Sequence, residues 1–529
     1  MDPLTDRRKP TSKTLDRRGF LWAVAVGAAA AMWAAGCTQG LAPRADVNVK
    51  QTSGLLAEGT EWETPYYILE SGIPGPTLLI TGGVHGDEPA GYRAADEIRH
   101  WPLKRGRLIV VPRVNTPGLK AGTRWLPGEA EATRNANRNF PKTGAPNTAV
   151  SLIVRALWEF IQAQSPDWVV DLHEGSDFHV VNPTSVGSSI VFFDTPEMQA
   201  LAKKIQQDVN ATITDPQREI VLRTVGPIDG GLVRATIERT GAKGFCFETT
   251  YKQQPLSLRT RQHRLMVHRL MRELDMAAGD AQVMTPRPKG GQVQVAVYDG
   301  GGTGGKGATN LTGILDGDER TAVHHVGPPD IAAGALDQFD VVIFPGGSGK
   351  AEAGALGKEA VAAVRTFVRN GGGYVGICAG AFLSSTNYEW SLAIINNQTI
   401  PGKLHERGGG TVTIELTDGG RQMFGDKPGL LDVYYHNGPM FLPAGLAGLP
   451  AFTPLALFRS EVSKYEEQKG TMINTPAIIA APCGRGRVLA ISPHPESVPA
   501  LHFIIRQGVQ WVAGREQAAA SKPAGAAVE

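Results

Sequence analysis

Two short segments of this chain carry side chains whose types and spacing suit a metal site. His85 and Glu88 follow the apolar run 77–80, and His173 follows a second apolar run at 169–172. Both runs have the character of strands, so the strand ends could bring the two imidazoles and the carboxylate together. Two histidines and one carboxylate match the protein ligands of hydrolytic zinc sites, which keep one tetrahedral position for water. The segments therefore predict one Zn²⁺ held by His85, Glu88 and His173.

Zinc in such a site lowers the pKa of a bound water to about 7 and polarises a carbonyl, which makes attack on an amide or ester feasible. Glu248 ends a third short apolar run, residues 244–247, and is the candidate general base. The segment Arg134–Pro141 lies between the two ligand segments, and a guanidinium there could hold a carboxylate through two parallel hydrogen bonds. The expected substrate therefore carries a free carboxylate.

The Asn137-Arg138 pair lies between the two histidine segments. In this order, the motifs resemble the zinc carboxypeptidase superfamily, especially its succinylglutamate desuccinylase and aspartoacylase-like branch, over roughly residues 55–275. The resemblance implies zinc at the three positions named above and the same glutamate as general base and proton shuttle. It also implies that Asn137 and Arg138 hold the terminal carboxylate of the substrate. The family uses a further arginine to stabilise the oxyanion, and both Arg124 and Arg134 are candidates for that role.

Three polar residues beside the second histidine have more than one interpretation. Asp171 lies two residues before His173, so it either shares a strand face with the histidine and orients it, or is a solvated loop acid. Glu174 and His179 are interpreted as ordinary loop residues.

A second group of reactive side chains lies in the C-terminal half. Cys378 is flanked by glycines after a short apolar run, the pattern of a nucleophile elbow, in which a sharp strand-to-helix turn exposes the nucleophile. His494 could take the thiol proton, and Glu496 could orient the imidazole. Together with the apolar run and glycine turn at 340–347, these residues resemble the triad of class I glutamine amidotransferases, whose turn helps to form the oxyanion hole.

The segments 376–381 and 434–439 are most similar to the amidotransferase-like domain at the N-terminus of some biotin-protein ligases, and the resemblance covers about residues 292–515. It implies no activity by itself, because no synthetase domain accompanies it to receive ammonia. The alternative is a binding fold whose cysteine packs as a small hydrophobe. Two glycine-rich loops, 300–307 and 346–350, are not interpreted as nucleotide-binding loops. The first has glycine at the position where a Ser or Thr hydroxyl should bind magnesium, and the second matches the motif no better.

The N-terminus has the pattern of an export signal. Residues 15–21 resemble a twin-arginine signal and precede the mostly apolar residues 22–35. Residues 34–37 resemble a lipobox, in which Cys37 would be acylated and become the mature N-terminus, and Thr38 favours the outer membrane. The alternatives are simple cleavage or an uncleaved anchor, for which the apolar stretch is short. We expect export to the periplasm or cell envelope, with membrane contact through the lipid anchor alone.

Charge and cysteine content bear on the partners and the redox state of the chain. The chain has 53 basic and 51 acidic residues, and no basic stripe argues for nucleic acid. Four cysteines, with Cys37 assigned to lipid, leave an odd number in an oxidising compartment, which predicts at least one free thiol.

Apolar strands alternate with helical patterns, as at 108–111 and 152–162 in the first half and at 341–344 and 361–369 in the second. The expected fold is α/β, with two doubly wound domains whose sheets are mainly parallel or mixed. The expected division is a signal peptide at 1–37, a tether at 38–54, a deacylase-like domain at 55–280, a linker at 281–291, an amidotransferase-like domain at 292–515 and a disordered tail at 516–529.

These observations predict an exported zinc hydrolase that cleaves an amide bond beside a free carboxylate, with envelope peptides as the suggested substrates. An alternative within hydrolases is an N-acyl amino acid deacylase. An alternative of another class is a catalytically silent protein that binds cell-wall peptides or a partner.

Overall fold

The structure is a computed structural model, and it describes residues 49–279, 291–400 and 402–515 of the 529-residue chain. The predicted signal, the lipidation site at Cys37 and the tail lie outside the described residues, as do most of the tether and linker. Within these described ranges, no helix has both the length and the apolar character that crossing a membrane requires.

The N-terminal domain is built on one eight-stranded mixed sheet. Its four central strands run parallel, whereas the strands at both margins include antiparallel pairs. In spatial order the strands are β1 (Lys50–Leu56), β2 (Thr64–Glu70), β4 (Arg107–Val111), β3 (Thr77–Gly82), β5 (Trp168–Gly175), β8 (Lys243–Thr250), β6 (Ser189–Val191) and β7 (Val221–Arg223). The central strands are apolar on both faces because helices cover both faces, as expected for parallel strands.

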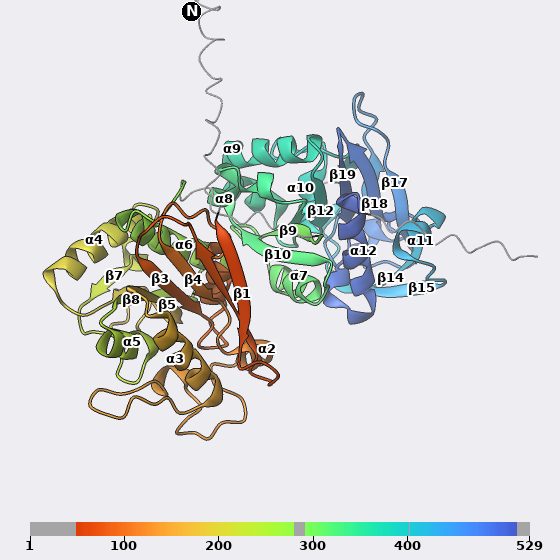
Figure 1. Ribbon diagram of the computed structural model, residues 1–529. Coiled ribbons are helices and arrows are strands. Elements are labelled where there is room, and N and C mark those ends of the chain that lie inside the picture. The colour runs from red at the N-terminus through yellow and green to blue at the C-terminus, as the bar shows by residue number, and fades with distance from the viewer. Residues whose placement is uncertain (1–48, 280–290, 401, 516–529) are drawn as a thin grey trace, which may run out of the picture. The chain divides into compact units, whose positions relative to one another are not determined.

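The helices of this domain are α1 (Pro89–Ile98), α2 (Thr116–Ala121), α3 (Leu152–Gln164), α4 (Pro196–Asn210), α5 (Leu232–Thr240) and α6 (Leu256–Glu273). Apolar residues of α1, α4 and α6 pack in a core on one face of the sheet. Those of α3 and α5 pack in a second core on the other face (Figure 1). In α3, buried apolar residues recur at helical spacing, so one stripe of the helix faces the sheet.

The C-terminal domain is built on a nine-stranded mixed sheet, in which five strands run parallel and four antiparallel strands extend one side. In spatial order they are β10 (Thr321–Val326), β9 (Val293–Tyr298), β11 (Val341–Phe344), β12 (Gly373–Ile377), β19 (Gly486–Ile491), β18 (Pro476–Cys483), β17 (Thr453–Phe458), β14 (Gly409–Leu416) and β15 (Leu430–His436). Two further strands, β13 (Asn397–Thr399) and β16 (Phe441–Pro443), form a small antiparallel sheet.

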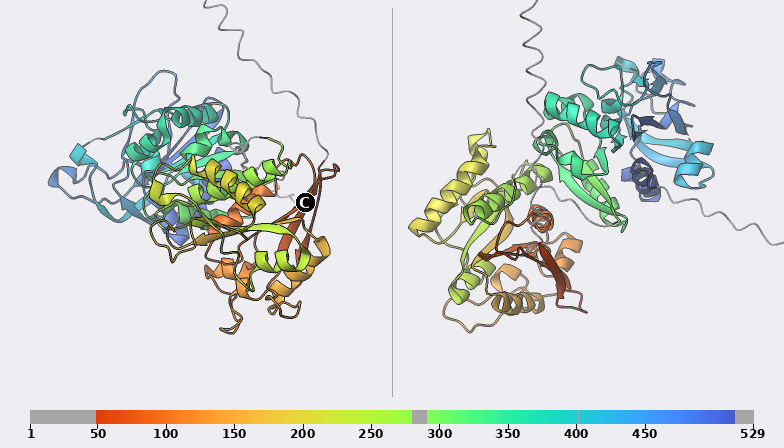
Figure 2. Two further views of the ribbon diagram at one scale, coloured as in Figure 1. Left: turned by 90° about the vertical axis from the view of Figure 1, so that its left-hand side faces the viewer. Right: turned by 45° about the horizontal axis from the view of Figure 1, so that its top comes forward.

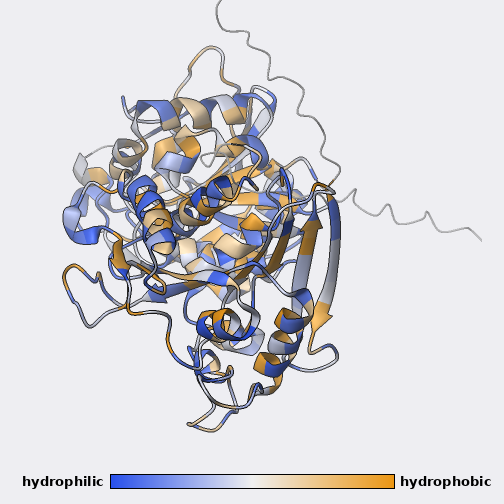
Figure 3. Cartoon of the chain, turned by 60° about the vertical axis from the view of Figure 1, so that its left-hand side comes forward, coloured by the Kyte–Doolittle hydropathy of each residue, from blue (hydrophilic) through white to orange (hydrophobic). Residues whose placement is uncertain are grey.

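The helices of the C-terminal domain are α7 (Gly307–Asp316), α8 (Pro328–Ala332), α9 (Gly349–Arg369), α10 (Ala379–Ser384), α11 (Asp418–Phe424) and α12 (His502–Val512). One face of the sheet packs against α7, α11 and α12, and the other against α8, α9 and α10. The views in Figure 2 show helices on both sides of each sheet, and Figure 3 shows hydrophobic residues concentrated along the strands. The prediction of two doubly wound α/β domains with mixed sheets is thus confirmed.

Candidate functional site

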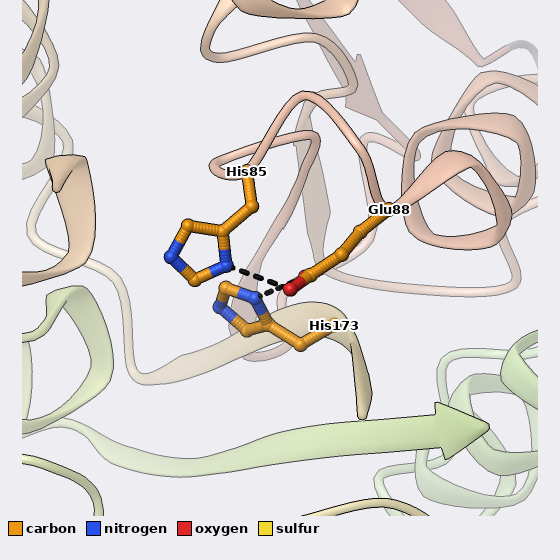
Figure 4. A group of neighbouring side chains, drawn as sticks. All are labelled: His85, Glu88 and His173. Carbon is orange, nitrogen blue, oxygen red and sulfur yellow. Dashed lines mark hydrogen bonds and ion pairs between the residues drawn. The ribbon is translucent and has the colours of Figure 1, made fainter. Parts of the chain in front are cut away.

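The three predicted metal ligands meet at the carboxyl ends of two adjacent parallel strands. His85 and Glu88 lie in the loop that joins β3 to α1, and His173 lies near the end of β5. Figure 4 shows both imidazoles directed at the same carboxylate, and the Nδ1 atoms of His85 and His173 lie 2.9 and 2.8 Å from oxygens of Glu88. One ligand atom from each residue can be chosen so that all three lie within 4.8 Å of one another.

The donor set fits a zinc ion, because each imidazole is held by a partner at its other nitrogen. Nε2 of His173 lies 2.6 Å from Oδ2 of Asp171, and Nε2 of His85 lies 3.1 Å from Oδ1 of Asn135. A metal-binding histidine usually donates its remote N–H to such an oxygen, which fixes the ring and leaves the facing nitrogen free for the metal. Asp171 is buried and also accepts a hydrogen bond from the Thr81 hydroxyl, so it orients the ligand rather than being a solvated loop acid.

Burial makes the charges of this cluster interdependent. All three ligand side chains are nearly inaccessible to solvent. Burial by itself would raise the pKa of Glu88, but the adjacent His85 and His173 outweigh it and hold this pKa well below its usual range. Burial lowers the pKa of His173, but Asp171 and Glu88 outweigh it and raise this pKa well above the usual value. These shifts favour an ionised Glu88 beside a protonated His173, so a divalent cation bound here would displace the His173 proton.

Glu174 is a structural part of the site, and its interpretation as a loop residue is wrong. Its carboxylate is buried and pairs with Arg259 of α6, and it accepts a hydrogen bond from the N–H of Ala90 at 3.3 Å. Its own N–H donates to Glu88 at 3.1 Å. Burial raises the pKa of Glu174 to about 7, although the Arg259 guanidinium opposes this shift. Sequence reasoning missed Arg259, because α6 begins more than eighty residues after Glu174.

Glu248 lies beside the ligand cluster on β8, where it is paired in register with His173 of β5. One carboxylate oxygen accepts a hydrogen bond from the Cys246 thiol at 3.6 Å, and the other is buried without a hydrogen-bond partner among the described residues. Burial raises the pKa of Glu248 to about 7, with a further upward contribution from Glu88. A carboxylate with one free oxygen and a pKa near neutrality is suited to taking up and returning a proton.

A cavity of about 210 Å³ lies over these residues. Its polar lining includes His85, Asn137, Arg138, His173 and Glu248, and its apolar wall is formed by Val186, Val191, Val225, Ile228 and Val233. Asn137 and Arg138 lie in a single 3-10 turn at residues 136–138. Burial and the nearby Arg124 lower the pKa of Arg138, which is the expected effect of bringing two cations into one partly desolvated site.

The structure distinguishes the two arginines that the sequence left as alternatives. Arg124 lines the cavity and pairs with Glu88. Arg134 does not line the cavity, since its guanidinium pairs with the exposed Glu131 at 2.9 Å and lies over the ring of Trp125. Of the two candidates for the oxyanion role, Arg124 therefore lies at the cavity and Arg134 lies outside it. Arg223 also lines the cavity, and no sequence motif indicated it.

The second predicted group also meets in space. Cys378 joins β12 to α10 with φ 48° and ψ −96°, a strained conformation for a residue with a side chain and one typical of nucleophile elbows. Nδ1 of His494 lies 2.8 Å from Oε1 of Glu496. Burial lowers the pKa of His494, but Cys378 and Glu496 outweigh it and raise this pKa to about 10. A Cβ atom at Gly346 would lie 2.7 Å from the His494 ring and 3.7 Å from Cβ of Cys378, so only glycine fits between them.

The three cysteines within the described ranges, Cys246, Cys378 and Cys483, are all free thiols. His179 is held by the Ser185 carbonyl at 2.6 Å and does not line the cavity.

Two family models match separate parts of the chain. Residues 74–274 match the family described as the succinylglutamate desuccinylase/aspartoacylase catalytic domain, and residues 293–401 match the family described as biotin-protein ligase, N terminal. The two matches confirm both resemblances, the first over most of the N-terminal domain and the second over the first part of the C-terminal domain. Hydrolase activity is the activity that this family assignment supports.

Individual relatives cover only parts of this chain. N-α-acetyl-L-2,4-diaminobutyric acid deacetylase of Halomonas elongata is 38% identical over 104 residues, which is 19% of this chain and 29% of that protein. A cell shape determinant protein of Helicobacter pylori, described as a D,L-carboxypeptidase, is 24% identical over 38% of this chain and 51% of its own, with a TM-score of 0.33. An aspartoacylase family protein from Mesorhizobium loti is 21% identical over 44% of this chain and 68% of its own, with a TM-score of 0.32.

Proposed function

We propose that the N-terminal domain is a zinc-dependent amidohydrolase that cleaves an amide bond beside a free carboxylate. The supporting observation is that His85 and His173, which both contact Glu88, line one cavity together with Arg138 and with Glu248, whose carboxylate has a free oxygen. His85, Glu88 and His173 would hold a single Zn²⁺. When bound, zinc supplies Lewis acidity, which polarises the scissile carbonyl and makes water a stronger acid.

The protein's own side chains account for the remaining steps. Arg138, with Asn137 beside it, binds the substrate carboxylate and so sets the distance from the carboxylate to the scissile bond. Glu248 takes a proton from the attacking water and returns it to the leaving nitrogen. Arg124, which lines the cavity beside Glu88, donates hydrogen bonds to the oxygen that gains negative charge.

The size of the cavity favours a small substrate. A volume of about 210 Å³ is below the range of about 300–1,000 Å³ that is usual for drug-sized ligands. It suits an N-acyl amino acid better than a long peptide, and the matched family supports the same choice. Cleavage of the last residue from a short envelope peptide is the second candidate, since a peptide could enter with only its carboxyl-terminal residue in the cavity.

The proposed location is the cell envelope, after export by the twin-arginine route and acylation of Cys37. The arginine pair, the apolar stretch and the lipobox-like cysteine support this proposal. Cell fractionation tests this proposal. Wild type should leave the membrane fraction only when detergent is added, whereas Cys37→Ala should not need detergent for its release. Recovery of both forms in the soluble cytoplasm would contradict it.

The central experiment compares Glu248→Gln with wild type. We expect about one zinc per chain in both proteins by elemental analysis, and a loss of about 10²–10⁴-fold in the hydrolysis rate of N-acyl amino acids in the variant. Cys378→Ser is the matched control and should leave this hydrolysis unchanged, because its thiol lies in the other domain. Hydrolysis that survives in Glu248→Gln would remove Glu248 from the mechanism. Zinc bound by a wild-type protein that turns over neither N-acyl amino acids nor short peptides would favour a binding protein.

A further inference from the structure

The C-terminal domain contains a cavity of about 980 Å³, larger than the cavity over the candidate metal ligands, and Cys378 and His494 lie in its wall. The two glycine-rich loops that fail as nucleotide-binding motifs meet in the same wall. Lys306 ends the first loop and Lys350 ends the second, and both side chains are exposed at the cavity. The loops and the reactive cysteine therefore belong to one site.

The electrostatic character of this cavity is positive. Lys306 and Lys350 form no ion pair with any described residue, whereas the single carboxylate in the lining, Glu496, is already held by His494. The cavity is also reached by the N-terminal ends of α7 at Gly307 and α9 at Gly349, where unpaired N–H groups favour an anion. Apart from Glu496, the described residues of the lining contain no carboxylate that could bind the ammonium group of an amino acid.

One buried acid lies close to this site without cancelling its charge. Glu352 of α9 has no solvent exposure, and neither of its oxygens has a hydrogen-bond partner among the described residues. Burial raises the pKa of Glu352 well above its usual value, with a further contribution from Cys378, so the side chain is held in its neutral form.

Part of the cavity wall is aromatic. The rings of Tyr388 and Trp390 are stacked with centroids 4.6 Å apart, and both line the cavity together with Phe382. Such a wall suits a flat or apolar group.

We propose that this cavity is a second catalytic site, in which Cys378 accepts an acyl group that itself bears a carboxylate or phosphate, from an ester or amide bound through Lys306 and Lys350. The proposal goes beyond the zinc hydrolase and does not depend on it. It names carboxylate- or phosphate-bearing acyl compounds as the substrate class, instead of a zwitterionic amino acid.

The reaction balances with the groups present. Nδ1 of His494 donates to Glu496, which leaves Nε2 to take the thiol proton as Sγ of Cys378 forms a bond to the carbonyl carbon. The N–H groups of Gly347 and Ala379 have no recorded acceptor among the described residues and can donate to the oxyanion. The leaving alcohol or amine departs with the proton from His494. Water then attacks the thioester, and its proton passes through His494 to the departing thiolate, giving a free acid.

The test uses rigid esters that differ in the charge and electronic effect of the para substituent, so each rate is compared with the uncatalysed hydrolysis of the same ester. The 4-nitrophenyl esters of 4-carboxybenzoic, 4-methylbenzoic and 4-(trimethylammonio)benzoic acid are mixed with the full chain carrying Glu248→Gln, which suppresses the zinc site. Release of nitrophenolate is corrected for the uncatalysed rate, and peptide mass mapping locates the acyl group. We expect acylation of Cys378 to be about tenfold faster with the carboxylate ester than with the neutral ester, and slowest with the cationic ester, since two surface charges each give a modest preference.

The variants distinguish the parts of the proposal. Cys378→Ala should lose the acyl adduct, and Cys483→Ala should keep it. The double variant Lys306→Ala, Lys350→Ala should retain acylation but lose the preference for the anionic ester, whereas Lys358→Ala, an exposed lysine of α9 outside the cavity, should not. No adduct on Cys378 with any ester would overturn the catalytic role. Equal rates for the three esters, or faster release of ammonia from glutamine, would overturn the proposed substrate class.

Discussion

Asp171 offers the sharpest test of how the zinc site is built. Its side chain is 1% exposed and holds Nε2 of His173 at 2.6 Å and the Thr81 hydroxyl at 2.7 Å. The substitution Asp171→Asn keeps the size of the side chain and one acceptor oxygen but removes the charge. The imidazole then becomes a weaker metal ligand and is less firmly oriented. Loss of such a partner typically lowers metal affinity about 10- to 100-fold, which corresponds to about 1.4–2.7 kcal/mol.

The assay is competition for zinc between the protein and a chromogenic chelator, at one pH and ionic strength. Asp208→Asn, which changes an exposed acid of α4, is the matched control for net charge and should bind zinc as wild type does. Unfolding in urea of the metal-free proteins separates loss of affinity from loss of structure. Zinc affinity of Asp171→Asn within about twofold of wild type, with both proteins folded, would refute the idea that Asp171 tunes the ligand.

Two further predictions concern stability. The raised pKa of Glu352 means that its full contribution to stability is present below its ordinary pKa of 4.5 and is lost as pH rises through the folded-state value. Glu352→Gln should therefore flatten the fall in unfolding free energy that begins as pH rises above about 4.5, a fall of at most about 1.4 kcal/mol per pH unit in wild type. The same pH dependence of urea unfolding in both proteins would contradict this. Gly91→Ala should destabilise the N-terminal domain by about 1–3 kcal/mol, because the new Cβ would lie 2.3 Å from the Leu172 carbonyl oxygen. Gly313→Ala, in the interior of α7 where no atom lies near the new Cβ, should instead be neutral or stabilising. Thermal unfolding of both glycine variants beside wild type is the measurement.

Much of the metal site could be predicted from the sequence, because each ligand follows an apolar run and parallel strands end at one edge of a sheet. His85, Glu88 and His173 needed only that rule to be brought together. The tertiary partners could not be predicted, since no local pattern relates Glu174 to Arg259. The same limit applied to Arg124 and Arg134, which are ten residues apart in a loop without periodicity. The path of that loop decides which arginine reaches the cavity, and no local pattern indicates it.

Helix boundaries were predicted unevenly, for a physical reason. The helix expected at 152–162 is α3, whose strong apolar stripe defines its length, ending two residues later at Gln164. The helix expected at 361–369 begins much earlier, at Gly349. Its first half is rich in alanine and glycine, so the apolar stripe is weak, and Gly357 interrupts the helical conformation with φ 71°. Packing of α9 against β19 and α10 stabilises the helix where its own apolar pattern is weak.

The complete burial of β5 has a consequence for how variation in this chain should be read. One face of the strand carries Val169, Asp171 and His173, and the other carries Val170 and Leu172 in the hydrophobic core. In a saturation mutagenesis experiment, consecutive positions should all fail, with no tolerant residue between them. The failures should alternate in kind, with normal abundance but no turnover at Asp171 and His173, and low abundance at Val170 and Leu172. Substitutions that are tolerated elsewhere in the domain should therefore not be tolerated in β5.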